Sequence, residues 1–521
     1  MSDRSESPEG SDVSDISETL QNQVDDWSSN TTDACNIIFF RGKNELARFS
    51  PACTYPIFGE EEAVFGYKGL DISLSFASHN LKPHVSISWD EKWEDRGEIK
   101  ASDVRAALAD FLPESAFEDE SLPTDLSESE AAEFSPPGVR IEPYSIGGRN
   151  YEIWCARLVD PLAREMMENA QVLVPLFIEG GTELQMDHDW INERWKIFFL
   201  YEICDKSPGT SPYSMVGFAT SYQAFSLPDR SSPAAGLVNL LESEGPDSIL
   251  DLWSPEDTEA KMRASRSSTL DLPSRERISQ FIILPPYQGS GHGPQLYNKM
   301  YTFLIARNNV FELTVEDPNE AFDDMRDACD LVYLRDSEPD FDLLTINVDV
   351  ETAKLKPNAS IPVDDIVDGS TKKFIRTHYK IVPRQSARLV EMQTLSKIPT
   401  FNRNPARITK KEKSSNKQDR AYYFWRLYVK QRLYETHRDT LMELDHEDRI
   451  KKLEDTVNTV QADYERLLAL AEKRANHATK VQLPVLGAAR KERKRKVIVL
   501  DESDDDSAGV VVVKKGKTEL K

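Results

Sequence analysis

The stretch Ser279-Gln-Phe-Ile-Ile-Leu-Pro-Pro-Tyr-Gln-Gly-Ser-Gly-His-Gly-Pro-Gln-Leu296 decides the fold of this 521-residue chain. Its apolar run at 281–284 predicts a buried strand, the glycine-rich run at 288–293 a turn, and the residues from 295 to about 307 a helix. Exposed backbone N–H groups before a helix N-terminus form an anion site, because they point at the ligand and the helix dipole adds about half a positive charge. Glycine lets the backbone approach a phosphate with no Cβ in the way.

The spacing of the glycines distinguishes between phosphate-binding motifs. A dinucleotide fingerprint would need its third glycine at position 294, which is Pro294, and a Walker A loop would need a Lys-Ser/Thr pair after the last glycine. The signature that fits is Gln/Arg-x-x-Gly-x-Gly/Ala, at Gln288, Gly291 and Gly293. It resembles the pyrophosphate loop of the GCN5-related N-acetyltransferases, which bind acetyl-coenzyme A. The alternative is an ordinary glycine-rich turn.

Composition narrows the class of protein. The net charge of −25 and the sequence pI of about 4.9 argue against a protein that binds DNA directly, and suit a basic partner. The five cysteines are scattered and lack metal-ligand spacing, so we expect a reducing intracellular compartment and no metal. No apolar run approaches the ~20 residues of a membrane span, and the acidic N-terminus does not resemble a signal peptide.

Shifts in composition divide the chain into segments. Acidic, Ser-rich or Pro-rich stretches without apolar periodicity predict disorder, and periodic stretches predict folded domains. The predicted segments are a disordered acidic lead at 1–33, an N-terminal mixed α/β domain at 34–160 with an acidic loop at 113–133, a core at 161–335 with a disordered insertion at 226–275 that carries a short helix at 235–241, a helical domain at 336–475, and a disordered tail at 476–521 with a basic and then an acidic run.

The predicted elements of the core follow a recognisable order. One helix or two precede two neighbouring antiparallel strands, and Pro175 should kink or break the helical pattern. After the insertion come the strand, the phosphate loop and its helix, then another strand and a helix that Asn319 could start. This is the element order of the acetyltransferase core. The elements are expected at 161–178, 195–203, 215–222, 281–284, 295–307, 310–315 and 321–329.

The N-terminal and C-terminal domains carry their own periodicities. Alternation of apolar and polar residues predicts strands at 71–76 and 84–89, and short apolar runs predict strands at 36–40 and 151–155. Helices are expected at 386–395 and 418–443. From Ile450 the apolar positions follow a 3-4 spacing, which is typical of a packed helix pair or a short coiled coil. A helical domain that packs on itself and a partner-binding face are both open.

Six separate segments carry one resemblance. They are Arg194-Trp195, Val216-Gly217, 279–293 and 315–327 in the core, and 58–62 and 65–70 in the N-terminal domain. Together they resemble the type B histone acetyltransferase catalytic subunits, in particular the fungal ones, from about residue 34 to 474 with gaps at 113–133 and 226–275. The resemblance implies an α+β fold: a mixed acetyltransferase sheet flanked by helices, an N-terminal α/β domain and a C-terminal helical domain.

The resemblance also implies the reaction and its co-substrate. The family moves acetyl from acetyl-coenzyme A to lysines in the N-terminal tail of newly synthesised histone H-four. The backbone of one set of residues would hold the acetyl-pantetheine arm, a second set would cradle the pyrophosphate, and Asn319 would make a further contact. The two sets are Phe281, Ile282 and Ile283, and Gln288, Gly289, Ser290, Gly291, His292, Gly293 and Pro294. Where fungal members tend to carry an arginine, this chain has Ala328, with Arg326 nearby.

The catalytic acid of the family corresponds to Glu316, with Asp317 adjacent and Glu179 as a second glutamate. The chemistry supports a base: a lysine amine has a reference pKa near 10.4, so at neutral pH its ammonium must lose a proton before it can attack a thioester. Convergence of these acids, with Glu179 partly desolvated, would suit that role. The alternatives are a helix-start signal at 316–318 and a solvent-exposed loop acid at Glu179.

Substrate contacts implied by the resemblance lie in both domains. Three consecutive acids beside an aromatic-glycine turn could grip a basic peptide, although a solvated acidic turn looks the same. The implied substrate residues are Glu60, Glu61, Glu62, Trp195, Tyr222, Gln223 and Ala224.

Partners and location follow from the same resemblance. It implies a WD-repeat histone chaperone as partner, and roles in DNA-damage responses and telomeric silencing. The basic run at 490–496 resembles a nuclear localisation signal, so we expect the protein in nucleus and cytoplasm. Two other classes stay open: an N-acetyltransferase with a different protein or small amine acceptor, and a histone-binding protein with an inactive core. A covalent acetyl-cysteine route is a weaker alternative, because no cysteine has a base beside it in the sequence.

Overall fold

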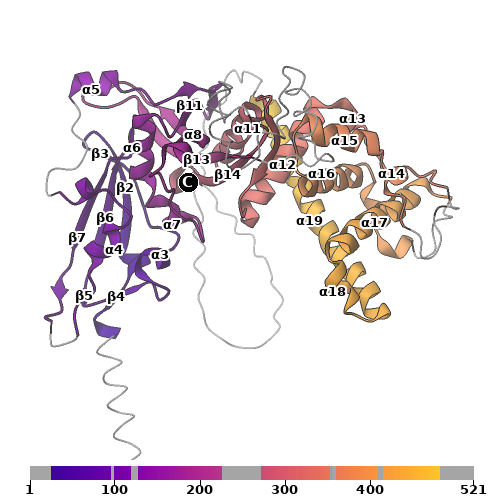
Figure 1. Cartoon of the computed structure of the whole chain (residues 1–521), viewed down its shortest axis with the longest axis horizontal. Helices are drawn as coiled ribbons and strands as arrows, with labels where there is room; N and C mark the ends of the chain where they lie inside the picture. The colour runs from indigo at the N-terminus through magenta and orange to yellow at the C-terminus, as the bar shows by residue number, and fades with distance from the viewer. Residues whose placement is uncertain are drawn as a thin grey trace, which may run out of the picture. The chain divides into compact units, whose positions relative to one another are not determined.

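The computed structural model describes residues 25–95, 99–118, 127–225, 272–351, 354, 360–408 and 415–481. The described residues up to Arg474 form one compact unit. The fold is mixed α/β, with helices packed on mixed sheets, so the α+β class is confirmed (Figure 1). In the part of the chain that is described, no helix is long and apolar enough to cross a membrane.

A seven-stranded sheet is the largest sheet of the described residues. Its strands follow the order β10-β11-β12-β13-β14-β15, with β9 paired to β11. All neighbouring pairs are antiparallel except β14 and β15, which are parallel. The strands are β9 (Val139–Arg140), β10 (Tyr144–Ile146), β11 (Arg149–Arg157), β12 (Trp195–Ile203), β13 (Tyr213–Phe225), β14 (Ser274–Ile283) and β15 (Val310–Val315).

Two layers cover the sheet. One face packs on α11 (His292–Ile305) and α12 (Glu320–Ser337), and its core includes Phe198 and Leu200. The other face packs on α6 (Pro161–Ala170), α7 (Leu173–Phe177) and the N-terminal domain, and its core includes Phe199 and Tyr201. The near-continuous apolar run of β12 is explained by this burial on both faces.

Strands β14 and β15 are paired only along the first half of β14. Their register ends at Ile278 opposite Val315, where β15 stops, while β14 runs on to Ile283. The register between β13 and β14 shifts at the same level, so β14 carries a bulge around Gln280, whose N–H bonds Thr220 Oγ1 at 3.1 Å. A bulge bends the strand. Residues 281–283 therefore pair with β13 on one side, and the whole segment 279–283 has no pairing with β15 on the other.

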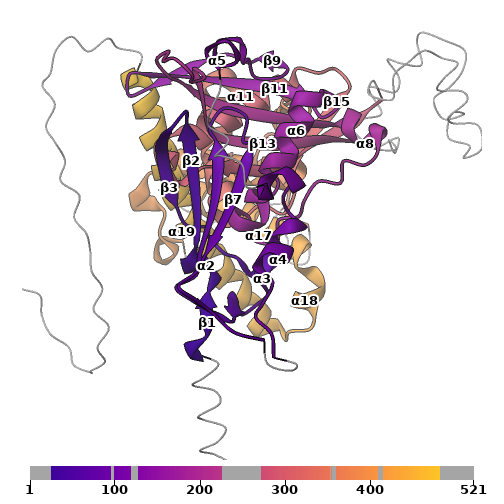
Figure 2. The same cartoon turned by 90° about the vertical axis from the view of Figure 1, so that its left-hand side faces the viewer.

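The N-terminal domain is built on a second sheet, of four strands in the order β3-β2-β6-β7 (Figure 2). Its central pair β2 and β6 is parallel, and the outer pairs are antiparallel. Short two-stranded ladders β1–β4 and β5–β8 accompany it. The elements are β1 (Ser28–Asn30), α2 (Thr31–Ala34), β2 (Cys35–Arg41), β3 (Asn44–Phe49), α3 (Tyr55–Phe58), β4 (Ala63–Phe65), β5 (Tyr67–Lys68), β6 (Asp71–Ala77), β7 (Pro83–Ser88), β8 (Glu91–Lys92) and α4 (Val104–Ala109).

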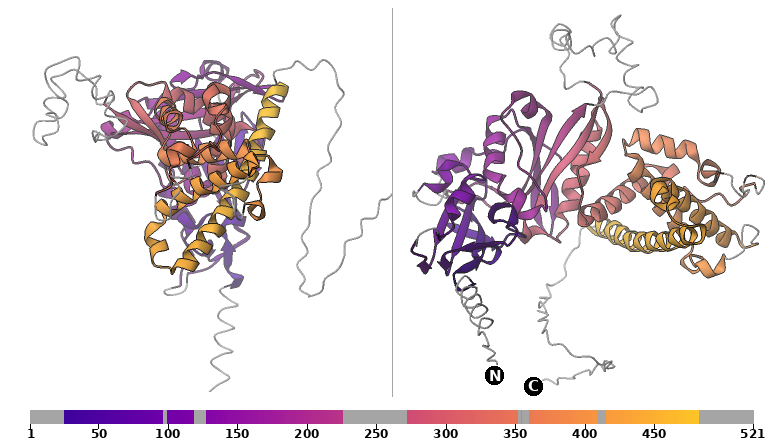
Figure 3. Two further views of the ribbon diagram at one scale, coloured as in Figure 1. Left: turned by 90° about the vertical axis from the view of Figure 1, so that its right-hand side faces the viewer. Right: turned by 60° about the horizontal axis from the view of Figure 1, so that its bottom comes forward.

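The C-terminal helices share one apolar core with the far side of α12 (Figure 3). Val457, Tyr464 and Leu467 of the long helix are buried in it, so this helix packs within its own domain as one of the two alternatives predicted. Ile450 departs from the predicted seam and is 50% exposed. The helices are α13 (Pro339–Asp342), α14 (Val363–Ile366), α15 (Gly369–His378), α16 (Pro383–Ser396), α17 (Lys417–Thr436), α18 (Arg438–Met442) and α19 (His446–Val481).

Several boundaries differ from the sequence predictions. The folded chain begins before residue 34, because β1 pairs with β4 and Thr31 is buried. Strands β9–β11, within 139–157, belong to the large sheet, whereas the predicted N-terminal domain at 34–160 included them. The predicted helix at 418–443 breaks at His437 into α17 and α18, and α19 continues past residue 475. The predicted helix at 235–241 and the tail beyond 481 lie outside the described residues.

Two local predictions also need correction. Pro175 does not break the helical pattern, because the break falls earlier, at Gln171 and Val172, and Pro175 lies in the first turn of α7, where an N–H is not needed. The acidic stretch 113–133 is not all loop. It contains the 3-10 helix η1 (Glu114–Phe117), whose Phe117 is buried, and helix α5 (Glu128–Glu133), which Ser127 and Glu130 start with reciprocal hydrogen bonds.

Candidate active site

The glycine-rich loop leads directly into helix α11. Gly289 and Gly291 have φ angles of 67° and 96°, the left-handed region that glycine adopts without strain, and Gly291 caps the helix. Nothing lies within 4 Å of the place where a Cβ on Gly289 would stand. The first turn of α11 thus presents its backbone N–H groups beside an open loop, an arrangement that suits a phosphate.

His292 differs from its neighbours in this loop. Its ring is buried, and Nδ1 lies 2.9 Å from the Tyr144 hydroxyl, with Tyr151 and Tyr287 packed around it. Burial lowers the pKa of His292, so the ring is neutral at physiological pH. Only the backbone of His292 can face an anion, and its side chain anchors the loop to the sheet.

Glu316 lies where β14 and β15 part. Its backbone N–H donates to the carbonyl of Ile278 at 2.9 Å, which fixes the residue at the end of the paired region. Oε2 accepts from the Ser279 hydroxyl at 2.7 Å, and Oε1 from the Tyr222 hydroxyl at 3.0 Å. Arg277 Nη1 lies 3.4 Å from Oε1 and 3.2 Å from the Tyr222 hydroxyl. The carboxylate is held by three donors, yet its side chain is 36% exposed and open to a ligand.

Three strands place these groups in one row. Trp195 of β12 lies opposite Tyr222 of β13, which lies opposite Arg277 of β14. The rings of Trp195 and Tyr222 are 4.6 Å apart, so the aromatic pair extends the site away from Glu316. Burial raises the pKa of Tyr222 above its ordinary value. The phenol stays protonated and donates a hydrogen bond to Glu316.

The other two predicted acids lie in different surroundings. Asp317 is exposed, has a φ of 35°, and acts electrostatically on Arg277. Glu179 is also exposed, so the predicted partial desolvation is wrong: Gly180 and Gly181 turn the chain outward after α7. Burial raises the pKa of the Cys53 thiol, and the negative charges of Glu62 and Glu179 raise it further. The loop itself stays near the site, since Gln280 Nε2 donates to the carbonyl of Thr182 at 2.9 Å.

Predicted substrate residues divide into open and closed positions. Glu60 and Glu61 are exposed. Glu62 instead accepts hydrogen bonds from the backbone N–H groups of Thr54 (2.5 Å) and Tyr55 (3.2 Å); these bonds, the one from Thr54 first, lower its pKa. It therefore ties its turn to the start of α3, in line with a structural role.

Within the triplet 222–224, Tyr222 faces the site and Gln223 points to the opposite face of the sheet. Gln223 is fully buried and its Nε2 donates to Ser274 Oγ at 2.9 Å, so a substrate contact through this side chain is excluded by its orientation. Consecutive strand residues point to opposite faces, which explains the difference from Tyr222. Ala224 is half-buried.

Asn319 and Arg326, two polar residues of the α12 region, both make contacts within the protein. Asn319 is the N-cap of α12, with Oδ1 accepting from the Phe322 N–H at 2.9 Å. Its amide NH₂ group remains for a ligand. Arg326 does not take the place of the arginine missing at Ala328, because it is buried against Asp330 and cannot reach a coenzyme.

Two residues of the site, Arg277 and Ser279, are not among the predicted site residues. Arg277 belongs to no motif, and Ser279 opens the stretch 279–296 but has no predicted role there. Their signal would have been the strand period, which places Arg277 and Ser279 two residues apart next to the end of the neighbouring strand. The described residues contain no group of three side chains that could hold a metal ion.

Comparison with known proteins identifies the family. A family model described as "Histone acetyl transferase HAT1 N-terminus" matches residues 27–179. A relative named histone acetyltransferase type B catalytic subunit from Aspergillus oryzae is 40% identical over 463 residues, covering 85% of this chain and 86% of its own length. The chain belongs to the histone acetyltransferase type B catalytic subunits.

Further relatives with the same name agree. The one from Emericella nidulans is 40% identical over 472 residues, covering 86% of this chain and 90% of its own length. The one from Pyricularia oryzae is 36% identical over 460 residues, covering 87% and 93%. As a member of the type B family the protein is an acyltransferase, and histone acetyltransferases use acetyl-coenzyme A as co-substrate.

Proposed function

We propose that this protein transfers acetyl from acetyl-coenzyme A to the ε-amino group of lysines in the N-terminal tail of histone H-four, by direct attack with Glu316 as general base. The observation that carries the proposal is the position of Glu316. It lies beside the point where β14 loses its partner strand, at one end of the segment 279–283 whose other end leads into the glycine-rich loop.

The coenzyme site follows from the backbone. The arm of acetyl-coenzyme A would lie along 279–283, where β14 has an edge not paired with β15, and bond the backbone of Phe281, Ile282 and Ile283 as an added strand does. The loop 288–294 would receive the pyrophosphate, because Gly289 leaves space for it and the start of α11 supplies N–H groups. This splayed sheet supports assignment to the GCN5-related N-acetyltransferase fold.

Bound there, the coenzyme supplies an activated thioester. Glu316 would take a proton from the substrate ammonium, directly or through one water. The freed amine forms the N–C bond as the C–S bond breaks. The proton on Glu316 passes to solvent, and the second proton that the nitrogen loses goes to the departing thiolate, which leaves as the thiol of coenzyme A. Ser279 and Tyr222 would hold the carboxylate in place throughout, since both donate to it. Trp195 and Tyr222 would flank the aliphatic part of the lysine.

Exposed acids support a basic peptide as acceptor. Glu60 and Glu61, with Asp317 at the site itself, offer negative charge to a lysine-rich tail, and the net charge of −25 has the same sign. A WD-repeat chaperone as partner, and a distribution between nucleus and cytoplasm, accompany this proposal. Recovery of the chaperone in a pull-down with the full chain tests the partner.

The activity is tested by coenzyme A release from acetyl-coenzyme A with an H-four tail peptide. We expect turnover by the wild type, and a loss of ~10²–10⁴-fold in kcat for Glu316→Gln with coenzyme binding retained. Glu312→Gln is the matched control: Glu312 lies on β15, the strand that Glu316 follows, and bonds Arg275, so this variant should keep its activity.

Three outcomes contradict parts of the proposal. Equal rates for wild type and Glu316→Gln would make Glu316 a structural residue and move attention to Asp317 and Glu179. Acetylation of small amines in preference to the peptide would favour the alternative acceptor class. Binding of coenzyme A without any transfer would leave only a coenzyme-binding protein.

A further inference from the structure

Helix α12 separates the proposed coenzyme site from the C-terminal helices, and it touches both. Phe322, Met325 and Cys329 belong to the core between the large sheet and α11. Ala328, Leu331 and Leu334, on another side of the same helix, belong to the core of the C-terminal domain. A shift of α12 would therefore be felt in both regions, because packed cores do not deform freely.

On the first side, α12 forms a wall of the proposed coenzyme site. The rings of Phe322 and Phe281 are 5.1 Å apart in an edge-on contact, so α12 supports the strand segment assigned to the acetyl-pantetheine arm. Met325 Sδ lies 3.0 Å from where a Cβ on Gly293 would stand, and so supports the first turn of α11. The helix also begins at Asn319, three residues after Glu316.

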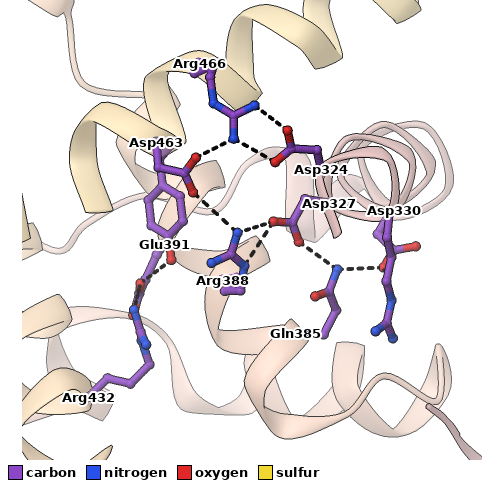
Figure 4. A network of polar contacts seen from close by, with 11 residues as sticks. Asp324, Asp327, Asp330, Gln385, Arg388, Glu391, Arg432, Asp463 and Arg466 are labelled. Atoms are coloured by element: carbon purple, nitrogen blue, oxygen red, sulfur yellow. Dashed lines mark hydrogen bonds and ion pairs between the residues drawn. The ribbon is translucent and has the colours of Figure 1, made fainter. Parts of the chain in front are cut away.

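On its other side, α12 presents three aspartates to the C-terminal domain (Figure 4). Asp327 is almost fully buried, and its Oδ2 accepts from both Nε (3.0 Å) and Nη2 of Arg388 on α16. Its Oδ1 accepts from Gln385 of the same helix at 2.9 Å, and Gln385 also donates to Asp330. Near the surface, Arg466 of α19 bonds Asp324.

The network reaches α11 as well. Tyr297 of α11 donates to Asp330 Oδ1 at 2.7 Å, while the other oxygen of Asp330 bonds Gln385. Helices α11, α12 and α16 are thus joined by one buried chain of polar contacts, and Arg388 provides the cation that compensates Asp327. A buried carboxylate that loses its cation is costly, so this pair determines how α12 is seated.

We propose that Arg388 is a positioning residue for coenzyme binding. Through Asp327 it holds α12, and with it Phe322 and Met325, against the strand and loop of the coenzyme site. The C-terminal domain is then part of the coenzyme site without touching the coenzyme. This inference rests on the coenzyme site proposed above.

The chain contains a matched control for the test. Arg432 on α17 likewise donates two hydrogen bonds to a buried carboxylate, that of Glu391 on α16, at 2.6 and 2.8 Å; each bond goes to a different oxygen, whereas both donors of Arg388 reach one oxygen of Asp327. The two arginine side chains are 22% and 27% exposed, and the two carboxylates 1% and 0%. Neither residue of the control pair lies on α12, so its loss should destabilise the domain and leave the coenzyme site in place.

The experiment compares Arg388→Gln with Arg432→Gln in the full chain. Calorimetry with coenzyme A gives its Kd, and steady-state kinetics give KM for acetyl-coenzyme A and for peptide. We expect Arg388→Gln to raise the coenzyme Kd and KM about tenfold, within the ~100-fold that a misplacement of about 1 Å can cost, with peptide KM unchanged. For Arg432→Gln the coenzyme constants should stay within about twofold despite a similar fall in Tm.

The possible results separate the two proposals. If both variants weaken coenzyme binding equally, or neither does, the positioning role of Arg388 is overturned and the proposed function stands. If the wild type binds no coenzyme A, the proposed function fails first. Should Arg388→Gln not fold, Asp327→Asn, which keeps an acceptor for Gln385 and removes the charge facing Arg388, must show the same selective rise in coenzyme Kd.

Discussion

Two glutamates, one on β14 and one just after the neighbouring β15, each face a cation and accept from a hydroxyl group, but their surroundings differ. Glu276 of β14 accepts from Lys196 Nζ at 2.7 Å and from the Ser221 hydroxyl at 2.8 Å. Glu316, just after β15, has a serine, a tyrosine and an arginine around it. The side chain of Glu276 is 0% exposed and that of Glu316 is 36% exposed. The chemical type of its hydrogen-bond partners therefore does not show whether a carboxylate can act on a substrate. Its exposure to a ligand does.

The position in the sheet explains the difference. Glu276 faces the α11 layer, where both strands are still paired with their neighbours, and Lys196 beside it is itself buried. Glu316 comes after the last pair of β15, where the sheet opens. The same two strands therefore support a closed ion pair and an open one, separated by the point at which they part.

The largest effect is expected for Glu316→Gln, which should lose activity. The same substitution should have little effect on stability. Because Glu316 is partly exposed, its removal should change the free energy of unfolding by less than about 1 kcal/mol. A chemical-denaturation curve checks this. A large loss of stability would make Glu316 a structural residue like Glu276.

The reverse pattern is expected for Glu276→Gln. It leaves the buried Lys196 ammonium without its carboxylate, and breaking a buried pair in this way costs about 3 to 5 kcal/mol. Denaturation curves should show this loss, while kcat of the folded fraction stays near that of the wild type. The double variant Lys196→Met with Glu276→Leu should recover most of the stability, since an apolar pair of similar volume removes both buried charges. A double variant no more stable than Glu276→Gln would contradict the buried-charge explanation.

These contrasts also show what could be predicted from the sequence. The strands, the loop and the order of elements follow from period and glycine spacing, and the structure has β12, β13, α11 and β15 close to the predicted ranges. Glu316 could be placed because a family motif surrounds it. What periodicity could not supply is which side chains meet across the sheet: the bulge at 279–280 and the register of three strands bring Ser279, Arg277 and Tyr222 to Glu316.

Two residues predicted to contact substrate have side chains that point elsewhere, each for a local reason. Gln223 was grouped with Tyr222 although adjacent strand residues face opposite ways. Glu62 was grouped with Glu60 and Glu61, but its φ of 47° turns its carboxylate back onto α3. The buried network on α12 could not be predicted, because its members come from helices far apart in sequence.

A smaller effect is expected for Tyr222→Phe. The substitution removes one donor to Glu316 and keeps the ring that packs against Trp195. Hydrogen bonds to charged groups contribute about 1.5–3 kcal/mol, and partial exposure reduces this, so we expect kcat to fall about tenfold with little change in peptide KM. Steady-state kinetics measure both. A rise in KM at constant kcat would instead place the hydroxyl in substrate binding.

The smallest effect should come from Arg275→Gln. Arg275 Nε bonds Glu312 at 2.7 Å on the same two strands as the Arg277–Glu316 pair, but its side chain is 50% exposed and the pair lies before the point where the strands part. An arginine that water reaches so readily contributes less than about 1 kcal/mol. We expect stability and kcat both within that limit, measured by denaturation and by coenzyme A release. Arg277→Gln, two residues further along, removes the same charge and should lower kcat, because it faces Glu316. Equal kcat values for Arg275→Gln and Arg277→Gln would contradict this explanation, because the position of Glu316 at the opening of the sheet would then not account for its role.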